Sequence, residues 1–281
     1  MSEEESSDLA AKETHAIRDG NAAVWDVVGR TKYRDGFARA LESLKKGEHP
    51  FSEHELIHLR ALCQDCRRAI QLCCANGRSA LSLLALGAEE AVGVDISQEM
   101  VALAQELTNA LEVPATWYCC DVLEVPHELN GTADLVYTGG GALNWVMDID
   151  AWAAVTYRLL RPRGTLFLFE IHPLNYVWNY EAVDYTLAPG PNYCDGGIVV
   201  NRGYPASEVA YDTKIADRPT IHERIWPLGH VINALIKAGL ILRHFQEVAD
   251  GWTPFKNMSP EVLRRLPHAY MLIADKPAHT V

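Results

Sequence analysis

Four short segments of the chain combine small or acidic residues in a way that suits a ligand site. They are the small-residue turn at residues 73–78, Asp95, Asp121 and the glycine run at residues 138–141. Each segment follows a short apolar run that predicts a strand. In open α/β sheets, ligands bind outside the carboxyl ends of the strands. We therefore expect the four segments to surround one ligand.

The spacing of these residues indicates an adenosine-containing ligand. Asp95 lies 18 residues beyond Gly77, a distance at which an acidic side chain accepts hydrogen bonds from two ribose hydroxyls in nucleotide-binding α/β folds. Asp121 could accept from an adenine amino group, and a turn of small residues lets the backbone approach a ligand closely. Taken singly, the glycine could be an ordinary turn and each aspartate a helix cap. Their joint order favours a ligand site.

The elements that position these residues follow a repeated strand–helix pattern. Helices are expected at residues 79–86, after Ser97, at 148–160 and at 228–238. Continuous apolar strands that alternate with amphipathic helices indicate a parallel sheet covered on both faces. We predict an α/β fold with a Rossmann-like, doubly wound, seven-stranded sheet, mostly parallel with the last strand antiparallel. The strands are expected at residues 69–73, 91–95, 116–120, 133–138, 165–170, 240–248 and 268–274.

The chain is expected to form one domain, residues 15–281, after a disordered acidic tail at 1–14. Within it we expect N-terminal helices at 15–65 that cover the sheet and a cofactor-binding core at 66–171. Residues 172–226 are rich in Tyr, Trp, Asn, Gly and Pro and interrupt the repeat, so they are predicted to form a substrate lid. Residues 227–281 supply the last helix and strand pair.

The composition disfavours some classes of binding partner and some cellular locations. With 25 basic and 37 acidic residues the chain has a formal net charge of −12, which disfavours nucleic acid as a partner. Its start is acidic, unlike a signal peptide, and no apolar run approaches the roughly 20 residues of a membrane span. Seven cysteines, an odd number, fit a reducing cytoplasm better than a disulfide framework. Cys63 and Cys66 could bind zinc, but without a matching second pair we expect buried thiols and no metal.

Several of these segments resemble a known family. Residues 70–78, 86–88 and 92–97 resemble the first two motifs of class I S-adenosylmethionine-dependent methyltransferases, and Asp121-Val122 resembles the third. Residues 158–164 resemble the loop before the fifth strand, and residues 141–145, 170–173 and 226–240 resemble a small-molecule subgroup. The resemblance covers roughly residues 20–275. One departure is that Cys73 and Ala75 occupy the first two positions of the usual Gly-x-Gly-x-Gly turn.

The resemblance implies that the protein binds S-adenosylmethionine and methylates a nitrogen or oxygen atom of a small molecule. Cofactor contacts are expected from Tyr33, Cys73, Ala75, Asn76, Gly77, Asp95, Ile96, Met100, Asp121, Val122, Thr138 and Gly139. Glu170 and His172, which follow the fifth strand, are candidate general bases, and Tyr33 is a third candidate catalytic residue that could close over the cofactor. The acceptor is expected to contact Trp25, Trp145, Glu170, His172, Tyr176 and Trp178.

Other interpretations stay open. Glu170 could be paired with a core arginine, His172 could simply hold a turn before Pro173, and half of the aromatic residues could pack the lid alone. The chain could also be a non-catalytic module that binds the cofactor or a metabolite. A nicotinamide-dependent dehydrogenase is a third possibility, but that fold needs three glycines at the first turn and this chain supplies one. We expect a monomer or a homodimer.

Overall fold

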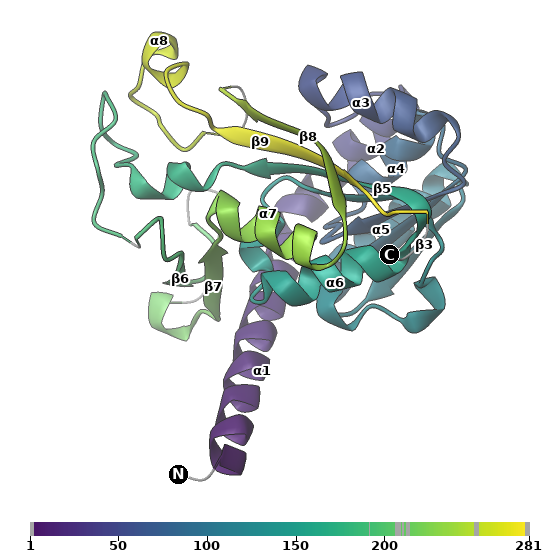
Figure 1. Ribbon diagram of the computed structural model, residues 1–281. Helices are drawn as coiled ribbons and strands as arrows, with labels where there is room; N and C mark the ends of the chain where they lie inside the picture. Colours follow the sequence, from purple (N-terminus) through teal and green to yellow (C-terminus); the bar gives the residue numbers. More distant parts are fainter. Residues whose placement is uncertain are drawn as a thin grey trace.

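The computed structural model contains a central seven-stranded sheet with the strand order β3-β2-β1-β4-β5-β9-β8 (Figure 1). It describes residues 3–190, 192–205, 209, 211, 214–249 and 253–278, with side chains from residue 14 onward. Strands β1 to β5 are parallel, and β9 runs antiparallel to β5 and β8. The predicted fold class is therefore confirmed. The strands are β1 (Arg68–Leu72), β2 (Glu90–Asp95), β3 (Ala115–Cys119), β4 (Ala133–Gly139), β5 (Leu160–Ile171), β8 (Ile241–Val248) and β9 (Ala269–Asp275).

Helices cover both faces of the sheet. On one face, α3 and α4 bury Leu59 and Leu83 against Leu135; on the other, α6 and α7 bury Trp152 and Leu235 in the same core as Ile70, Leu72 and Val136. Burial on both faces explains why the strands are continuously apolar. Within the described ranges, no helix is both long and apolar enough to cross a membrane. The helices are α1 (Glu3–Val28), the π-helix η1 (Gly29–Tyr33), α2 (Phe37–Lys45), α3 (Glu53–Gln64), α4 (Arg78–Ala85), α5 (Gln98–Leu111), α6 (Ile149–Leu159), α7 (Leu228–Lys237) and α8 (Pro260–Leu263).

The N-terminal segment is more helical than the sequence predicted. Helix α1 begins at Glu3, whereas residues 1–14 were expected to form a disordered tail; residues 1–2 of that tail lie outside the described residues. Alanine and glutamate are good helix formers, so the helical pattern from residue 16 extends toward the N-terminus. Helix α1 projects from the body of the molecule at that end (Figure 1).

The insertion at residues 172–226 supports α1. It contains the turn η5 (Pro173–Val177) and a hairpin of β6 (Gly197–Arg202) and β7 (Thr220–Ile225). The Asn21 side chain donates to the His222 carbonyl at 2.9 Å and accepts from the His222 amide at 2.8 Å, as a neighbouring strand would. A Cβ at Gly20 would lie 2.4 Å from the Thr220 carbonyl oxygen. The hairpin therefore holds α1 in close contact.

Candidate functional site

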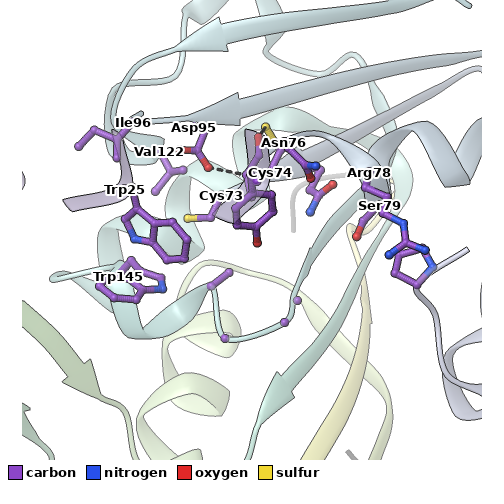
Figure 2. Close-up of a pocket in the computed structure, with 18 of the residues that line it drawn as sticks. Trp25, Cys73, Cys74, Asn76, Arg78, Ser79, Asp95, Ile96, Val122 and Trp145 are labelled. Carbon is purple, nitrogen blue, oxygen red and sulfur yellow. Dashed lines mark hydrogen bonds between the residues drawn. The ribbon is translucent and has the colours of Figure 1, made fainter. Parts of the chain in front are cut away.

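A cavity of about 720 Å³ opens at the carboxyl ends of the central strands. The N-terminal helices form one wall, and the segments that follow β1, β2, β3 and β4 form the others (Figure 2). This is the crevice that an open α/β sheet offers to ligands. The four segments that the sequence analysis singled out thus meet at one cavity, which is lined by residues 71, 73–76, 78–79, 95–96, 121–123, 139–142 and 145–147.

The turn after β1 bends sharply although it lacks two glycines. Cys73 has φ of 53° and Ala75 has φ of 46°, and both line the cavity with Asn76. Residues other than glycine adopt this left-handed region at a cost of about 1 kcal/mol. The backbone therefore has the conformation of a glycine turn, and each substituted residue carries some strain.

Asp95 anchors this turn from the end of β2. Its carboxylate is only 8% exposed. It accepts a hydrogen bond from the Ala75 amide at 2.7 Å, drawn as a dashed line in Figure 2, and another from the Ser97 amide at 3.0 Å. Burial raises its pKa to about 6, against the lowering effect of these bonds. A carboxylate has about four acceptor positions, so Asp95 can still receive ligand hydroxyls.

The same end of the cavity has a second carboxylate and apolar walls. Asp121 lines the cavity next to Val122, and one of its oxygens accepts from the Leu123 amide at 2.8 Å. Ile96 lines the cavity beside Asp95, and Figure 2 shows Ile96 and Val122 near each other. An apolar slot flanked by two carboxylates is suited to an adenine ring and its ribose.

The glycine run after β4 forms the cavity wall opposite the first turn. Gly139, Gly140 and Gly141 all line the cavity, and the last two have φ of 77° and 88°. The absence of side chains lets the backbone come close to any ligand there.

Three residues predicted to contact the cofactor do not line this cavity. A Cβ at Gly77 would lie 2.3 Å from the Trp117 ring, so this glycine makes room for a side chain of the protein. Met100 is fully buried in a cluster with Val24 and Leu103. Thr138 is fully buried as well.

The two candidate bases are also placed differently from the prediction. Glu170 is 2% exposed and its carboxylate accepts from the backbone amides of Gly141, Ala142 and Leu143, at 2.8, 2.9 and 3.2 Å. His172 is 1% exposed; it contacts Glu247 at 2.9 Å and accepts from the Leu174 amide. Neither lines the cavity, so we correct the expectation that they contact the reacting groups. Burial lowers the pKa of His172.

The aromatic residues divide into two groups. Trp25, Tyr33 and Trp145 line the cavity, and the two indole rings meet edge to face with centroids 5.0 Å apart. Tyr176 and Trp178 lie elsewhere. The Tyr176 hydroxyl accepts from the Asn144 side chain, and Trp178 packs on Tyr185. The N-terminal segment thus covers the cavity, and none of the described residues of the insertion lines it.

Sequence reasoning missed Gln71, the polar residue of β1. Gln71 is 4% exposed, it lines the cavity, and its Oε1 atom has no hydrogen-bond partner among the described residues. A buried polar atom without a partner is costly, so it suits a ligand that carries a hydrogen-bond donor. The sequence feature that could have identified Gln71 is that it is the single polar residue in the apolar run of residues 69–72.

Cys63, in the last turn of α3, and Cys66, which follows the helix, are the two cysteines that were considered for zinc. Cys63 and Cys66 are buried, and burial raises the pKa of each thiol to about 12. Among the described residues, no group of three His, Cys, Asp or Glu side chains could hold a metal ion.

The sheet order and this cavity define an open α/β protein with a cavity at the carboxyl ends of its central strands. Residues 69–164 match the family model described as a methyltransferase domain. Over this part the chain is similar to methyltransferase domains, and the cofactor that this similarity indicates is S-adenosylmethionine.

Individual proteins add support for the fold. A stretch of 59 residues is 39% identical to an uncharacterized protein of Methanocaldococcus jannaschii, and the match spans only 27% of that protein and 21% of this chain. S-adenosylmethionine-dependent methyltransferases of Mesorhizobium loti and Clostridium acetobutylicum have similar folds, with TM-scores of 0.58 and 0.56 at 21% and 11% identity. The first likeness covers 79% of this chain and 97% of the other, and the second covers 87% and 99%.

The residues of the cavity fit this cofactor. Asp95 and Asp121 suit the hydroxyl and amino groups of an adenosine, and Ile96 and Val122 suit its flat ring. The unpartnered oxygen of Gln71 suits the ammonium group of the methionine part. Donors and acceptors of the cavity thus match both halves of the molecule.

Proposed function

We propose that the protein transfers a methyl group from S-adenosylmethionine to a nitrogen or oxygen atom of a small molecule. The observation that carries this proposal is the convergence of Asp95, Asp121 and the strained turn at residues 73–76 on one cavity. The aromatic pair Trp25 and Trp145 in the same cavity supports an acceptor site next to the cofactor.

When bound, S-adenosylmethionine supplies an already activated methyl group, so positioning carries most of the catalysis. We propose that Asp95, Asp121 and Gln71 hold the cofactor, and that Trp25, Tyr33 and Trp145 orient the acceptor and exclude water. No histidine lines the described part of the cavity. This supports an acceptor that is already nucleophilic, such as an amine or a phenolate, over one that needs a histidine base.

Two observations support a small acceptor: the net charge of the chain and the helices that cover the cavity. A net charge of −12 opposes a nucleic acid substrate, and α1 and α2 supply one wall of the cavity. We also propose a cytoplasmic location, which an odd number of cysteines supports.

Two measurements test this function. The first is isothermal titration of the protein with S-adenosylhomocysteine, for which we expect a saturable, one-site isotherm. The second is transfer of radiolabelled methyl groups from S-adenosylmethionine to a metabolite extract. Absence of heat with both S-adenosylmethionine and S-adenosylhomocysteine would rule the proposal out.

A non-catalytic cofactor-binding module is the second candidate, because Cys73 and Ala75 replace glycines in the first turn. Binding in the titration together with no labelled product from any extract would favour this candidate. A labelled product would dismiss it.

The same turn yields a prediction. We expect the double variant Cys73→Gly/Ala75→Gly to bind S-adenosylhomocysteine several-fold more tightly, because two side chains leave the cavity wall. Its free energy of unfolding should change by less than about 1 kcal/mol, since relief of the left-handed strain offsets the added entropy of the unfolded chain. Titration and urea unfolding measure the two effects. Weaker binding by the variant would show that the thiol or the methyl group contacts the cofactor favourably.

A further inference from the structure

The buried carboxylate of Glu170 is surrounded by the loop that follows β4. The loop leaves β4 beside β5, where the Gly140 amide donates to the Phe169 carbonyl at 3.0 Å. It then folds back over Glu170, so that three consecutive amides, of Gly141, Ala142 and Leu143, donate to one carboxylate. Successive amides that point inward form an anion-binding concavity, and here a side chain of the protein fills it.

The loop is also the wall of the proposed active site. Gly140, Gly141 and Ala142 line the cavity. The amides of Gly141, Ala142 and Leu143 point away from it, to the carboxylate of Glu170. The positive φ values of Gly140 and Gly141 allow this conformation. The carboxylate therefore fixes the position of backbone that a ligand would contact.

The insertion holds the same loop from another side. The Tyr176 hydroxyl accepts from the Asn144 side chain, and the Trp226 indole donates to the Val146 carbonyl at 2.9 Å. The amides of residues 141–143 themselves donate to Glu170.

We propose that Glu170 is a positioning residue, which holds the loop at residues 140–143 in the shape that binds the cofactor and the acceptor. The identity of the ligand in this proposal rests on the proposed function, whereas the role of Glu170 in holding the loop does not. It replaces the expectation that Glu170 acts as a base, since Glu170 does not line the cavity. Loss of the charge should loosen the loop without unfolding the protein.

The charge of Glu170 should respond to pH near neutrality. Burial raises its pKa to about 7, against the lowering effect of the three amides. The titratable groups that face it are Cys73, Tyr137, Tyr176 and Tyr270, whose pKa values are all raised well above their ordinary values by burial. His172, two residues further along the chain, has a lowered pKa because of burial. Between pH 6.5 and 8.5, Glu170 is therefore the member of this group that changes charge.

As pH rises, the contribution of Glu170 to stability and the ordering of the loop change in opposite directions. A folded-state pKa above the ordinary value of 4.5 means that the folded protein binds this proton more tightly than the unfolded chain. The contribution of Glu170 to stability thus falls as pH rises from about 4.5 to 7. Loop ordering instead improves over the upper part of that range, because a carboxylate accepts stronger hydrogen bonds than a carboxylic acid.

The test compares Glu170→Gln with Glu55→Gln. Glu55 is a matched control because it is also buried, with a raised pKa, and accepts three hydrogen bonds, from Ser52 and the Tyr137 hydroxyl, none of them from residues 140–143. Amide hydrogen exchange of residues 140–143 and titration with S-adenosylhomocysteine are measured from pH 6.5 to 8.5.

At pH 8.5 we expect Glu170→Gln to exchange the amides of 141–143 about tenfold faster than the wild type and to bind about tenfold more weakly. Its thermal midpoint should be equal or higher. Both differences should shrink toward pH 6.5, and Glu55→Gln should match the wild type in both readouts. Unchanged exchange and binding in Glu170→Gln would overturn the proposal.

Two further measurements keep the test decisive. If Glu170→Gln does not fold, the wild type alone must show faster exchange of 141–143 at pH 6.5 than at 8.5, after correction for intrinsic rates; a constant corrected rate would overturn the proposal. If the wild type binds no S-adenosylhomocysteine, the proposed function fails, and the exchange data still decide whether Glu170 holds the loop.

Discussion

We expect Asp95→Ala to weaken the binding of S-adenosylhomocysteine by about 100-fold. The carboxylate is the hydrogen-bond acceptor for the Ala75 and Ser97 amides, and in the proposed complex it also receives the ribose hydroxyls. Hydrogen bonds to a charged group contribute about 1.5–3 kcal/mol each, and about 1.4 kcal/mol corresponds to a factor of ten in affinity. Loss of the ribose bonds and loosening of the turn therefore give at least two factors of ten. Isothermal titration measures the change.

Two other variants separate binding from folding. Asp95→Asn keeps the shape and one oxygen acceptor, so we expect a smaller loss of affinity, about tenfold. Because burial raises the pKa of Asp95 to about 6, its ionised form costs stability at pH 7.5, and Asp95→Asn should unfold at an equal or higher temperature. Asp150→Ala, which removes an exposed carboxylate of α6 paired with Lys237, should bind normally. Wild-type affinity in Asp95→Ala would contradict the adenosine site.

Affinity should also fall in acid. Protonation of Asp95 removes acceptors that the ribose hydroxyls need, so binding should weaken as pH drops through about 6. Asp95→Asn should lack this dependence. Titration of the two proteins between pH 5 and 7.5 makes the comparison, and parallel curves would assign the dependence to another group.

The sheet could be predicted from the sequence because each strand carries its own signal. Continuous apolar runs such as residues 133–138 need two covering layers wherever they lie, and the helices between them supply those layers. The order of strands then follows the rule for right-handed crossovers and the family resemblance. For the same reason, Asp95 and Asp121 could be placed together: each stands at the carboxyl end of a parallel strand, and those ends share one edge.

The roles of Glu170 and Gly77 could not be predicted in this way, because they depend on distant partners. The sequence shows that a carboxylate ending a buried strand needs a partner, but nothing local shows that the partners are amides 27–29 residues upstream. It likewise shows a glycine after a strand without showing that Trp117 fills the space beside it. The contacts of the insertion could not be predicted for a related reason: an aromatic-rich insertion suggests a lid, and nothing local shows that its hairpin packs on α1.

The packing at Gly77 predicts a large loss of stability from a single added methyl group. A Cβ at Gly77 would lie 2.3 and 2.7 Å from two atoms of the Trp117 ring and 2.9 Å from the Ala104 Cβ. Trp117 cannot swing aside freely, because its indole donates to the Thr108 hydroxyl at 2.9 Å. Overpacking of this kind costs about 1–3 kcal/mol, and the left-handed backbone adds about 1 kcal/mol. We expect Gly77→Ala to lower the free energy of unfolding by about 3 kcal/mol, measured by urea denaturation.

Gly131 offers a matched control for the backbone part of this cost. Its φ of 67° is close to the 73° of Gly77, but a Cβ there would have no atom within 4 Å. Gly131→Ala should therefore lose only about 1 kcal/mol, and the difference between the two variants measures the contact with Trp117. Adding Trp117→Leu to Gly77→Ala should recover part of the loss relative to Trp117→Leu alone, as a double-mutant cycle shows. If both variants lose the same free energy of unfolding, the turn needs glycine at position 77 for its backbone conformation alone. The space beside Gly77 would then again be open to a ligand.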